Sequence, residues 1–148
     1  MWDKYMACSN LGIPYKVYAM PKEIGGYSEL QNRYIHISPD KKDDDRVWAH
    51  EIAHTLCHFR NVKAAAGRDI TLNALAEMEA DTIAFVVCSV LGCADKKEYN
   101  KYMEVFISRL PLAMQTTKVI DEKLEYIKKQ AVIILAAAGY YDERNYQN

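Results

Sequence analysis

The segment His50-Glu51-Ile52-Ala53-His54 lies within an amphipathic stretch that we expect to be a helix. Asp43-Asp44-Asp45 precede it, and acidic residues in a first turn favour a helix through its dipole. We expect the helix to run to Phe59 or Arg60. Residues four apart lie on one helix face, about 6 Å apart along the axis. The two imidazoles can therefore converge on one tetrahedral metal ion, for which zinc is the expected identity.

The glutamate of this segment is expected to act as a general base. Glu51 is rotated by about 100° from His50 on a helix, so it is poorly placed as a third ligand but can reach a water at the metal. Zinc lowers the pKa of such a water, and the glutamate accepts its proton during attack on a carbonyl. The competing interpretation is a chance pattern on a polar helix face. A packed helix is favoured by its apolar positions, which are Ile52, Ala53, Leu56 and Phe59.

A catalytic zinc needs a third protein ligand, and the next predicted helix, from Leu72 to Leu91, offers one. Glu77, Ala80, Asp81 and Ala84 share one face of this helix at spacings of 3, 4 and 7. The small alanines allow a close approach to the first helix. We expect Glu77 to be the ligand and Asp81 to accept a hydrogen bond from a ligand histidine. The alternative is that these acidic residues are only solvated.

Three further residues of the same types are expected to lie outside the ligand set. His58 shares the face of His50 but lies about 12 Å away along the helix axis, which one ion cannot bridge. It also lacks the glycine turn that brings a third histidine to the metal in metzincins. We therefore interpret His58 as a structural or rim residue and His36 as a strand residue. Glu79 points to another side of its helix and is the weaker ligand candidate.

Length and composition indicate one globular domain spanning residues 1–148, and a small sheet followed by helices indicates the α+β class. Alternating patterns predict strands at 15–19 and 33–38 in a small antiparallel sheet, with a turn at Gly25-Gly26. Helices are expected at 2–10, 95–110 and 116–138 besides the two already described, and a loop at 61–70.

Charge, hydropathy and cysteine usage bear on the kind of partner and on the cellular location that we expect. A net charge of −1 and the lack of a helix-turn-helix pattern give no indication of direct nucleic-acid binding. The longest apolar run, residues 131–139, is too short to cross a membrane, and the start of the sequence is unlike a signal peptide. The four cysteines form no Cys-x-x-Cys pair, so we expect reduced thiols and a cytoplasmic location.

These segments together resemble the ImmA/IrrE family of zinc metallopeptidases and the related peptidase domain of ArdC-type antirestriction proteins. The resemblance extends from about Lys16 to Gly92. It is carried by Tyr34-Ile35-His36-Ile37-Ser38, by the segment at 50–54 with His58, and by Glu77-Met78-Glu79-Ala80-Asp81 leading into an apolar run. The first helical motif is shared by many zinc peptidases, whereas its pairing with the second is more specific.

The resemblance implies a zincin-like (gluzincin) core in which His50, His54 and Glu77 bind zinc and Glu51 is the general base. It implies a protein or peptide substrate lying along the strand at 33–38 by β-augmentation. A transcriptional repressor is the implied kind of substrate, and a phage or conjugative element the implied genetic setting. For the oxyanion, four residues remain open, none favoured by spacing: Tyr34, Tyr140, Tyr141 and His36.

Two other functions remain open at this point. One is a non-catalytic zinc-binding interaction module that retains a peptidase fold, against which the intact Glu51 argues, because a structural site needs no base. The other is a helical interaction domain without metal. A fourth protein ligand would favour the first of these, and purified protein without zinc would favour the second.

Overall fold

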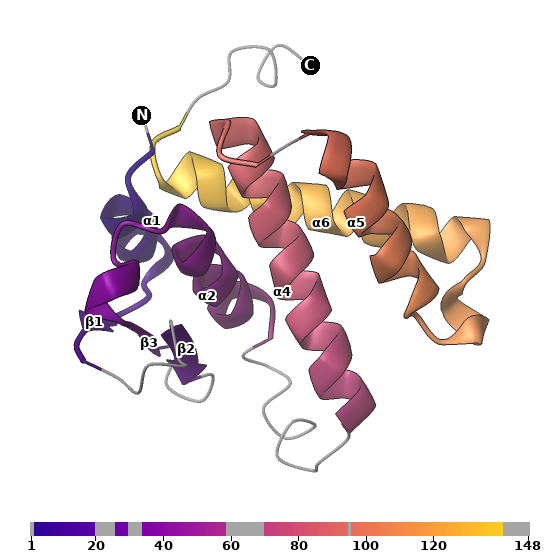
Figure 1. The fold of residues 1–148 in the computed structure, drawn as a ribbon, viewed down its shortest axis with the longest axis horizontal. Helices are drawn as coiled ribbons and strands as arrows, with labels where there is room; N and C mark the ends of the chain where they lie inside the picture. Colours follow the sequence, from indigo (N-terminus) through magenta and orange to yellow (C-terminus); the bar gives the residue numbers. More distant parts are fainter. Residues whose placement is uncertain (1, 20–25, 30–33, 59–69, 95, 141–148) are drawn as a thin grey trace.

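The computed structural model describes residues 2–19, 26–29, 34–58, 70–94 and 96–140, and its fold is mostly helical with one small sheet (Figure 1). The expected α+β class is confirmed. In chain order the elements are α1 (Lys4–Leu11), β1 (Tyr15–Val17), β2 (Gly26–Glu29), β3 (Tyr34–Ile37), η1 (Pro39–Lys41), α2 (Asp45–Cys57), α4 (Ile70–Leu91), α5 (Lys96–Ser108), η3 (Leu112–Met114) and α6 (Thr117–Ala137).

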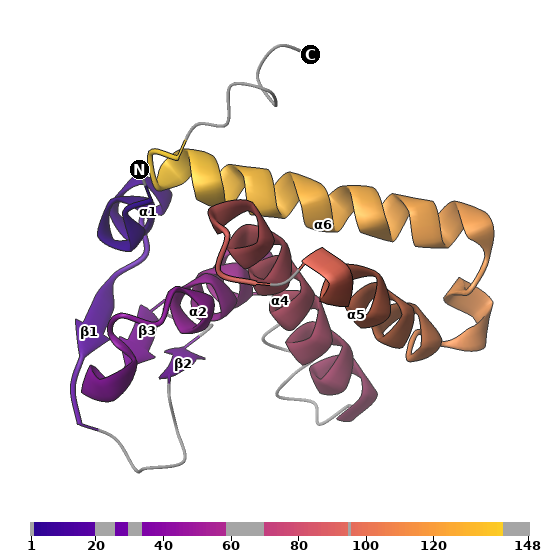
Figure 2. The ribbon, with the colours of Figure 1, turned by 45° about the horizontal axis from the view of Figure 1, so that its top comes forward.

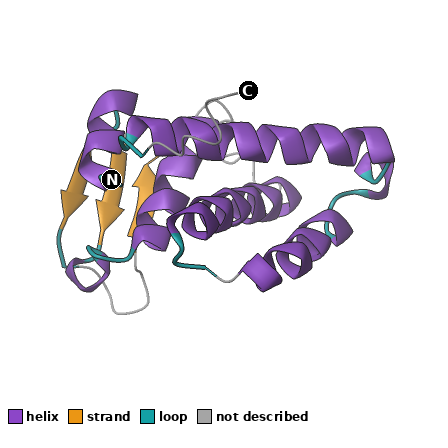
Figure 3. Ribbon diagram, turned by 90° about the horizontal axis from the view of Figure 1, so that it is seen from above, coloured by secondary structure: helices purple, strands orange, loops and turns teal. Residues whose placement is uncertain are grey.

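The helices pack on one another, and the sheet lies at one end of the helical layer (Figure 2, Figure 3). The long helix α6 crosses α4 and also contacts α1, while α4 packs against α2 (Figure 1, Figure 2). A continuous apolar core joins these elements; its fully buried members include Ile35 and Ile37 of β3, Trp48 and Ile52 of α2, Ile83 and Val87 of α4, and Ile127 and Ile134 of α6. No helix among the described residues is long and apolar enough to cross a membrane.

The sheet has the order β1-β3-β2, and the predicted antiparallel arrangement is wrong for one of its two strand pairs. β2 and β3 are antiparallel, but β1 and β3 are parallel, with Lys16 opposite His36. Residue alternation identifies a strand but carries no information on its direction. The chain leaving β1 forms β2 on the far side of β3 before it returns, and this return makes β1 and β3 parallel.

The central position of β3 corrects a second expectation. Both edges of Tyr34–Ile37 are already paired, one with β1 and the other with β2. A substrate peptide therefore has no open edge to join at this strand, contrary to the expectation for residues 33–38. Within the described sheet, the strands that have only one partner are β1 and β2.

The sequence pattern also misplaced Gly26, which begins β2 and does not form part of a turn. A Cβ atom at this position would lie 3.0 Å from the His36 carbonyl oxygen and 3.2 Å from Cγ1 of Val47. Real Cβ atoms rarely approach their neighbours so closely. The absence of a side chain therefore lets β2 lie against β3 and the start of α2.

The ends of the helices follow from local side-chain chemistry. Asp44 caps α2 by accepting hydrogen bonds from the backbone N–H groups of Arg46 and Val47, and α2 begins at the acidic run that was expected to open it. α2 ends at Cys57, slightly earlier than expected, and Gly92 ends α4 with a φ of 82°. The loop predicted for residues 61–70 lies outside the described residues, except that Ile70 begins α4.

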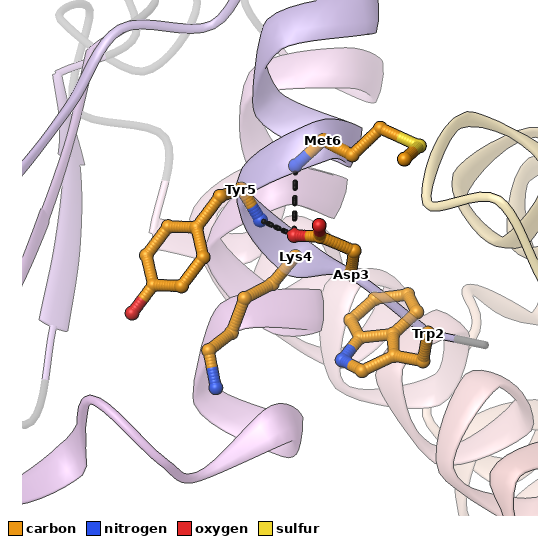
Figure 4. Close-up of a pocket in the computed structure, with 5 residues that line it drawn as sticks. All are labelled: Trp2, Asp3, Lys4, Tyr5 and Met6. Atoms are coloured by element: carbon orange, nitrogen blue, oxygen red, sulfur yellow. Dashed lines mark hydrogen bonds between the residues drawn. The ribbon is translucent and has the colours of Figure 1, made fainter.

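The N-terminal segment adds a shallow pocket of about 420 Å³ at the start of α1 (Figure 4). Its lining residues are Trp2, Asp3, Lys4, Tyr5 and Met6. Asp3 caps α1 through the N–H groups of Tyr5 and Met6, and Trp2 donates a hydrogen bond from Nε1 to Asp45 at 2.9 Å. The pocket thus belongs to the contact that fastens α1 to the start of α2.

Candidate metal centre

His50, His54 and Glu77 form a group that can hold a metal ion, and we call these three residues the metal group. The histidines lie one turn apart on α2, and Glu77 reaches them from α4. One oxygen of Glu77 lies 3.2 Å from Nε2 of His50, and the other lies 3.0 Å from Nε2 of His54. One ligand atom from each of the three residues falls within 4.8 Å of the others.

This geometry fits a metal ion. Tetrahedral bonds of about 2.0–2.1 Å place ligand atoms about 3.3–3.4 Å apart, close to the two distances between Glu77 and the histidines. Nε2 of His54 is buried and has no hydrogen-bond partner, although an oxygen of Glu77 lies 3.0 Å from it. A buried nitrogen in that condition is costly unless another partner uses its lone pair. A metal ion would be such a partner.

Asp81 lies behind the first histidine, as the helical spacing predicted. Its carboxylate lies 2.9 Å from Nδ1 of His50, so Nδ1 carries a hydrogen and Nε2 turns towards Glu77. Burial by itself lowers the pKa of His50, but the hydrogen bond to Asp81, the contact with Glu77 and the charge of Glu51 outweigh it and raise this pKa to about 10. In the metal-free protein His50 is therefore protonated on both nitrogens at neutral pH.

Glu77 and Glu51 differ in exposure. Glu77 has 64% of its side chain exposed, and contact with the two histidines holds its pKa far below the ordinary value. The metal group is consequently open to solvent on the α4 side. Glu51 is only 6% exposed, and its carboxylate lies 4.0 Å from Nε2 of His50, beside the ligand atoms but not among them.

Behind the second histidine lies a set of contacts that the sequence analysis missed. Nδ1 of His54 lies 2.9 Å from Nδ1 of His58, and Nε2 of His58 lies 2.9 Å from Glu79. His58 is 5% exposed, so it lies in the interior and not at a rim. Glu79 is not a member of the metal group, but it forms a hydrogen bond with His58, which in turn contacts His54. The signal available in the sequence was the one-turn spacing of His54 and His58.

Three of the four residues considered for the oxyanion lie in the described part of the chain. Tyr140 donates a hydrogen bond to the carbonyl of Val90 at 3.4 Å, and that carbonyl lies about 20 Å along α4 from Glu77. The Tyr34 hydroxyl donates to the carbonyl of Tyr15, 3.5 Å away. His36 is buried in the sheet against the rings of Tyr18 and Tyr34. Tyr141 lies outside the described residues.

Comparisons of this chain with protein-family models, with curated proteins and with solved structures found no match. The functional argument therefore rests on the metal group and its surroundings. Those surroundings consist of a buried carboxylate beside the ligand atoms and hydrogen-bond partners behind both histidines.

Proposed function

We propose that this chain is a zinc metallopeptidase with a zincin-like (gluzincin) core, similar to the ImmA/IrrE family. The observation that carries the proposal is the convergence of two imidazole nitrogens and one carboxylate beside the buried Glu51. Mixed nitrogen and oxygen ligands with two histidines are typical of catalytic zinc in hydrolases. Zinc bound there would polarise a substrate carbonyl and make a bound water acidic.

Glu51 and Asp81 supply the proton transfer and the positioning that the reaction needs. Glu51 accepts a proton from the attacking water and returns it to the departing amine. Its low exposure keeps the carboxylate away from bulk water, which strengthens its interactions with the reacting groups. Asp81 holds the imidazole of His50 in the orientation that ligation requires.

The number of ligands favours catalysis over a structural role for zinc. Structural zinc sites are closed by four protein ligands, whereas catalytic sites have three and leave one position open. Over the described part of the chain, the metal group has three members, and the most exposed of them is Glu77. This supports a peptidase over a zinc-binding interaction module.

For the substrate we propose a peptide segment that adds to the edge of β2. A strand with one partner offers its free backbone groups to an extended peptide, and β2 packs against α2, the helix that carries both histidines. A transcriptional repressor in the cytoplasm remains our proposed substrate on the strength of the resemblance. The four free cysteines fit that reducing compartment.

The test replaces the base and leaves the ligands intact. Zinc-loaded wild type, Glu51→Gln and a control, Glu122→Gln, are incubated with a library of quenched fluorescent peptides. Glu122 is an exposed residue of α6 and experiences the same chemical change. We expect full zinc content in all three proteins and a loss of cleavage of about 10²–10⁴-fold in Glu51→Gln alone. Cleavage by Glu51→Gln at the wild-type rate would refute the mechanism.

A further inference from the structure

The second ligand histidine is held by a buried set of hydrogen bonds that we call the histidine relay: His54, His58 and Glu79. His54 has one ring nitrogen towards Glu77 and the other 2.9 Å from His58. His58 in turn lies 2.9 Å from Glu79. Two of the residues come from α2 or its C-cap and the third from α4, so the relay crosses the interface between these helices.

Chemistry assigns the hydrogens of the relay in only one way. A histidine that ligates metal through Nε2 must carry its hydrogen on Nδ1. Nδ1 of His54 therefore donates to Nδ1 of His58, which must accept with its lone pair. The hydrogen of His58 then sits on Nε2 and is donated to the carboxylate of Glu79. The position of the hydrogen on His54 thus fixes its position on His58, and the relay ends at a carboxylate, which can only accept.

The two ligand histidines are thus both backed by a carboxylate, through different routes. His50 donates directly to Asp81, whereas His54 reaches Glu79 through His58. Glu79 is also paired with Lys123 of α6, whose Nζ lies 3.5 Å from its other oxygen. This second contact fixes the carboxylate, since Glu79 has only 13% of its side chain exposed.

We propose that His58 and Glu79 are positioning residues that hold His54 in the tautomer and orientation needed to bind zinc. This inference rests on the proposed zinc site. His54 and His58 are both almost fully buried. If His58 is removed, water therefore cannot replace it as the acceptor of the Nδ1 hydrogen of His54. Partners of ligand histidines commonly contribute 10–100-fold to metal affinity.

The first experiment measures zinc affinity by competition with a chromophoric chelator. His58→Phe fills the space without an acceptor, while His58→Asn places an amide oxygen near the position of Nδ1. Thr55→Val is the matched control: Thr55 is buried on α2, and its hydroxyl donates to the backbone carbonyls of Glu51 and Ile52 in its own helix. We expect affinity to fall about 10–100-fold in His58→Phe. It should fall less in His58→Asn, which keeps an acceptor for Nδ1 of His54 but loses the contact with Glu79. In Thr55→Val it should stay within about threefold of wild type.

The second experiment uses the wild-type protein and needs no substitution. Two-bond ¹⁵N–¹H spectra of the zinc-bound protein report which ring nitrogen of each histidine carries hydrogen. We expect hydrogen on Nδ1 of His54 and on Nε2 of His58. Hydrogen on Nδ1 of His58 would overturn the relay, even if His58→Phe failed to fold.

The outcomes also separate the relay from the proposed function. If wild type binds zinc tightly and a folded His58→Phe binds it equally well, the relay is wrong and the zinc site stands. If wild type binds no zinc, the proposed function fails and the relay fails with it.

Discussion

Zinc binding should displace a proton from His50, and this makes affinity depend steeply on pH. In the metal-free protein the pKa of His50 is raised to about 10, despite burial, by Asp81, Glu77 and Glu51. Zinc requires the neutral imidazole. Below the raised pKa, metal and proton compete for the same nitrogen.

The magnitude follows from this competition. Apparent affinity should rise about tenfold per pH unit while His50 is mostly protonated. Between pH 7 and pH 9 the gain is about a hundredfold, or about 2.7 kcal/mol. The direction is fixed because raising the pH removes the competing proton and not the metal.

Two measurements and one variant check this prediction. Chelator competition at half-unit pH steps gives the slope, and calorimetry in buffers of different ionisation enthalpy gives the number of protons released. Asp81→Asn retains an oxygen that accepts from Nδ1 but removes the charge, so it should lower the pKa of His50 and flatten the slope at high pH. An affinity that stays constant from pH 7 to pH 9, or an Asp81→Asn profile identical to wild type, would refute the reasoning.

Three further predictions concern stability. Zinc at a hundred times its Kd should stabilise the fold by about 2.7 kcal/mol, or about 5–11 °C in melting temperature by differential scanning fluorimetry, and an unchanged melting temperature would contradict it. Burial raises the pKa of Glu79, but hydrogen bonds from His58 and Lys123 outweigh it and lower this pKa below its ordinary value of 4.5. The resulting stability is present above about pH 4.5 and lost as pH falls through the lowered value, so urea midpoints should decline less in Glu79→Gln. Ile52→Ala, at a fully buried position of α2, should cost about 2–5 kcal/mol in urea denaturation; a loss below about 1 kcal/mol would contradict its place in the core.

Helical geometry made most of the metal group predictable from sequence. A one-turn spacing is fixed by the backbone, so it placed His50 and His54 on one face without tertiary information. The same rule placed Glu77 and Asp81 on one face of the next helix, and the structure brings that face to α2. The small Ala80 and Ala84 on that face favoured its approach to α2, whereas the crossing of the two helices, which decides the detailed contacts, could not be derived from the sequence.

The errors arose where pairing between distant segments decides the outcome. Alternation located β1 and β3 but not β2, which lies between them in the chain. Without β2, the two strands looked like an antiparallel hairpin, and their parallel direction was missed. His58 was expected to lie outside the ligand set because of its distance along the helix axis, and it is not a member of the metal group. Its contact with His54 follows from the same one-turn spacing that pairs His50 with His54, and the distance to the ion gives no information on that contact. Glu79 was discounted for pointing away from Glu77, yet α4 passes α2 so that both carboxylates meet histidines one turn apart.

The most direct test of the central claim is the zinc content of the purified protein. Wild type, His54→Ala and the control Cys93→Ser, which removes an exposed thiol, are purified without chelators or metal-affinity resin and incubated with zinc. After removal of free metal, elemental analysis should find about one zinc per chain in wild type and in Cys93→Ser, and almost none in His54→Ala. Wild type without zinc, or His54→Ala with a full complement, would contradict the account.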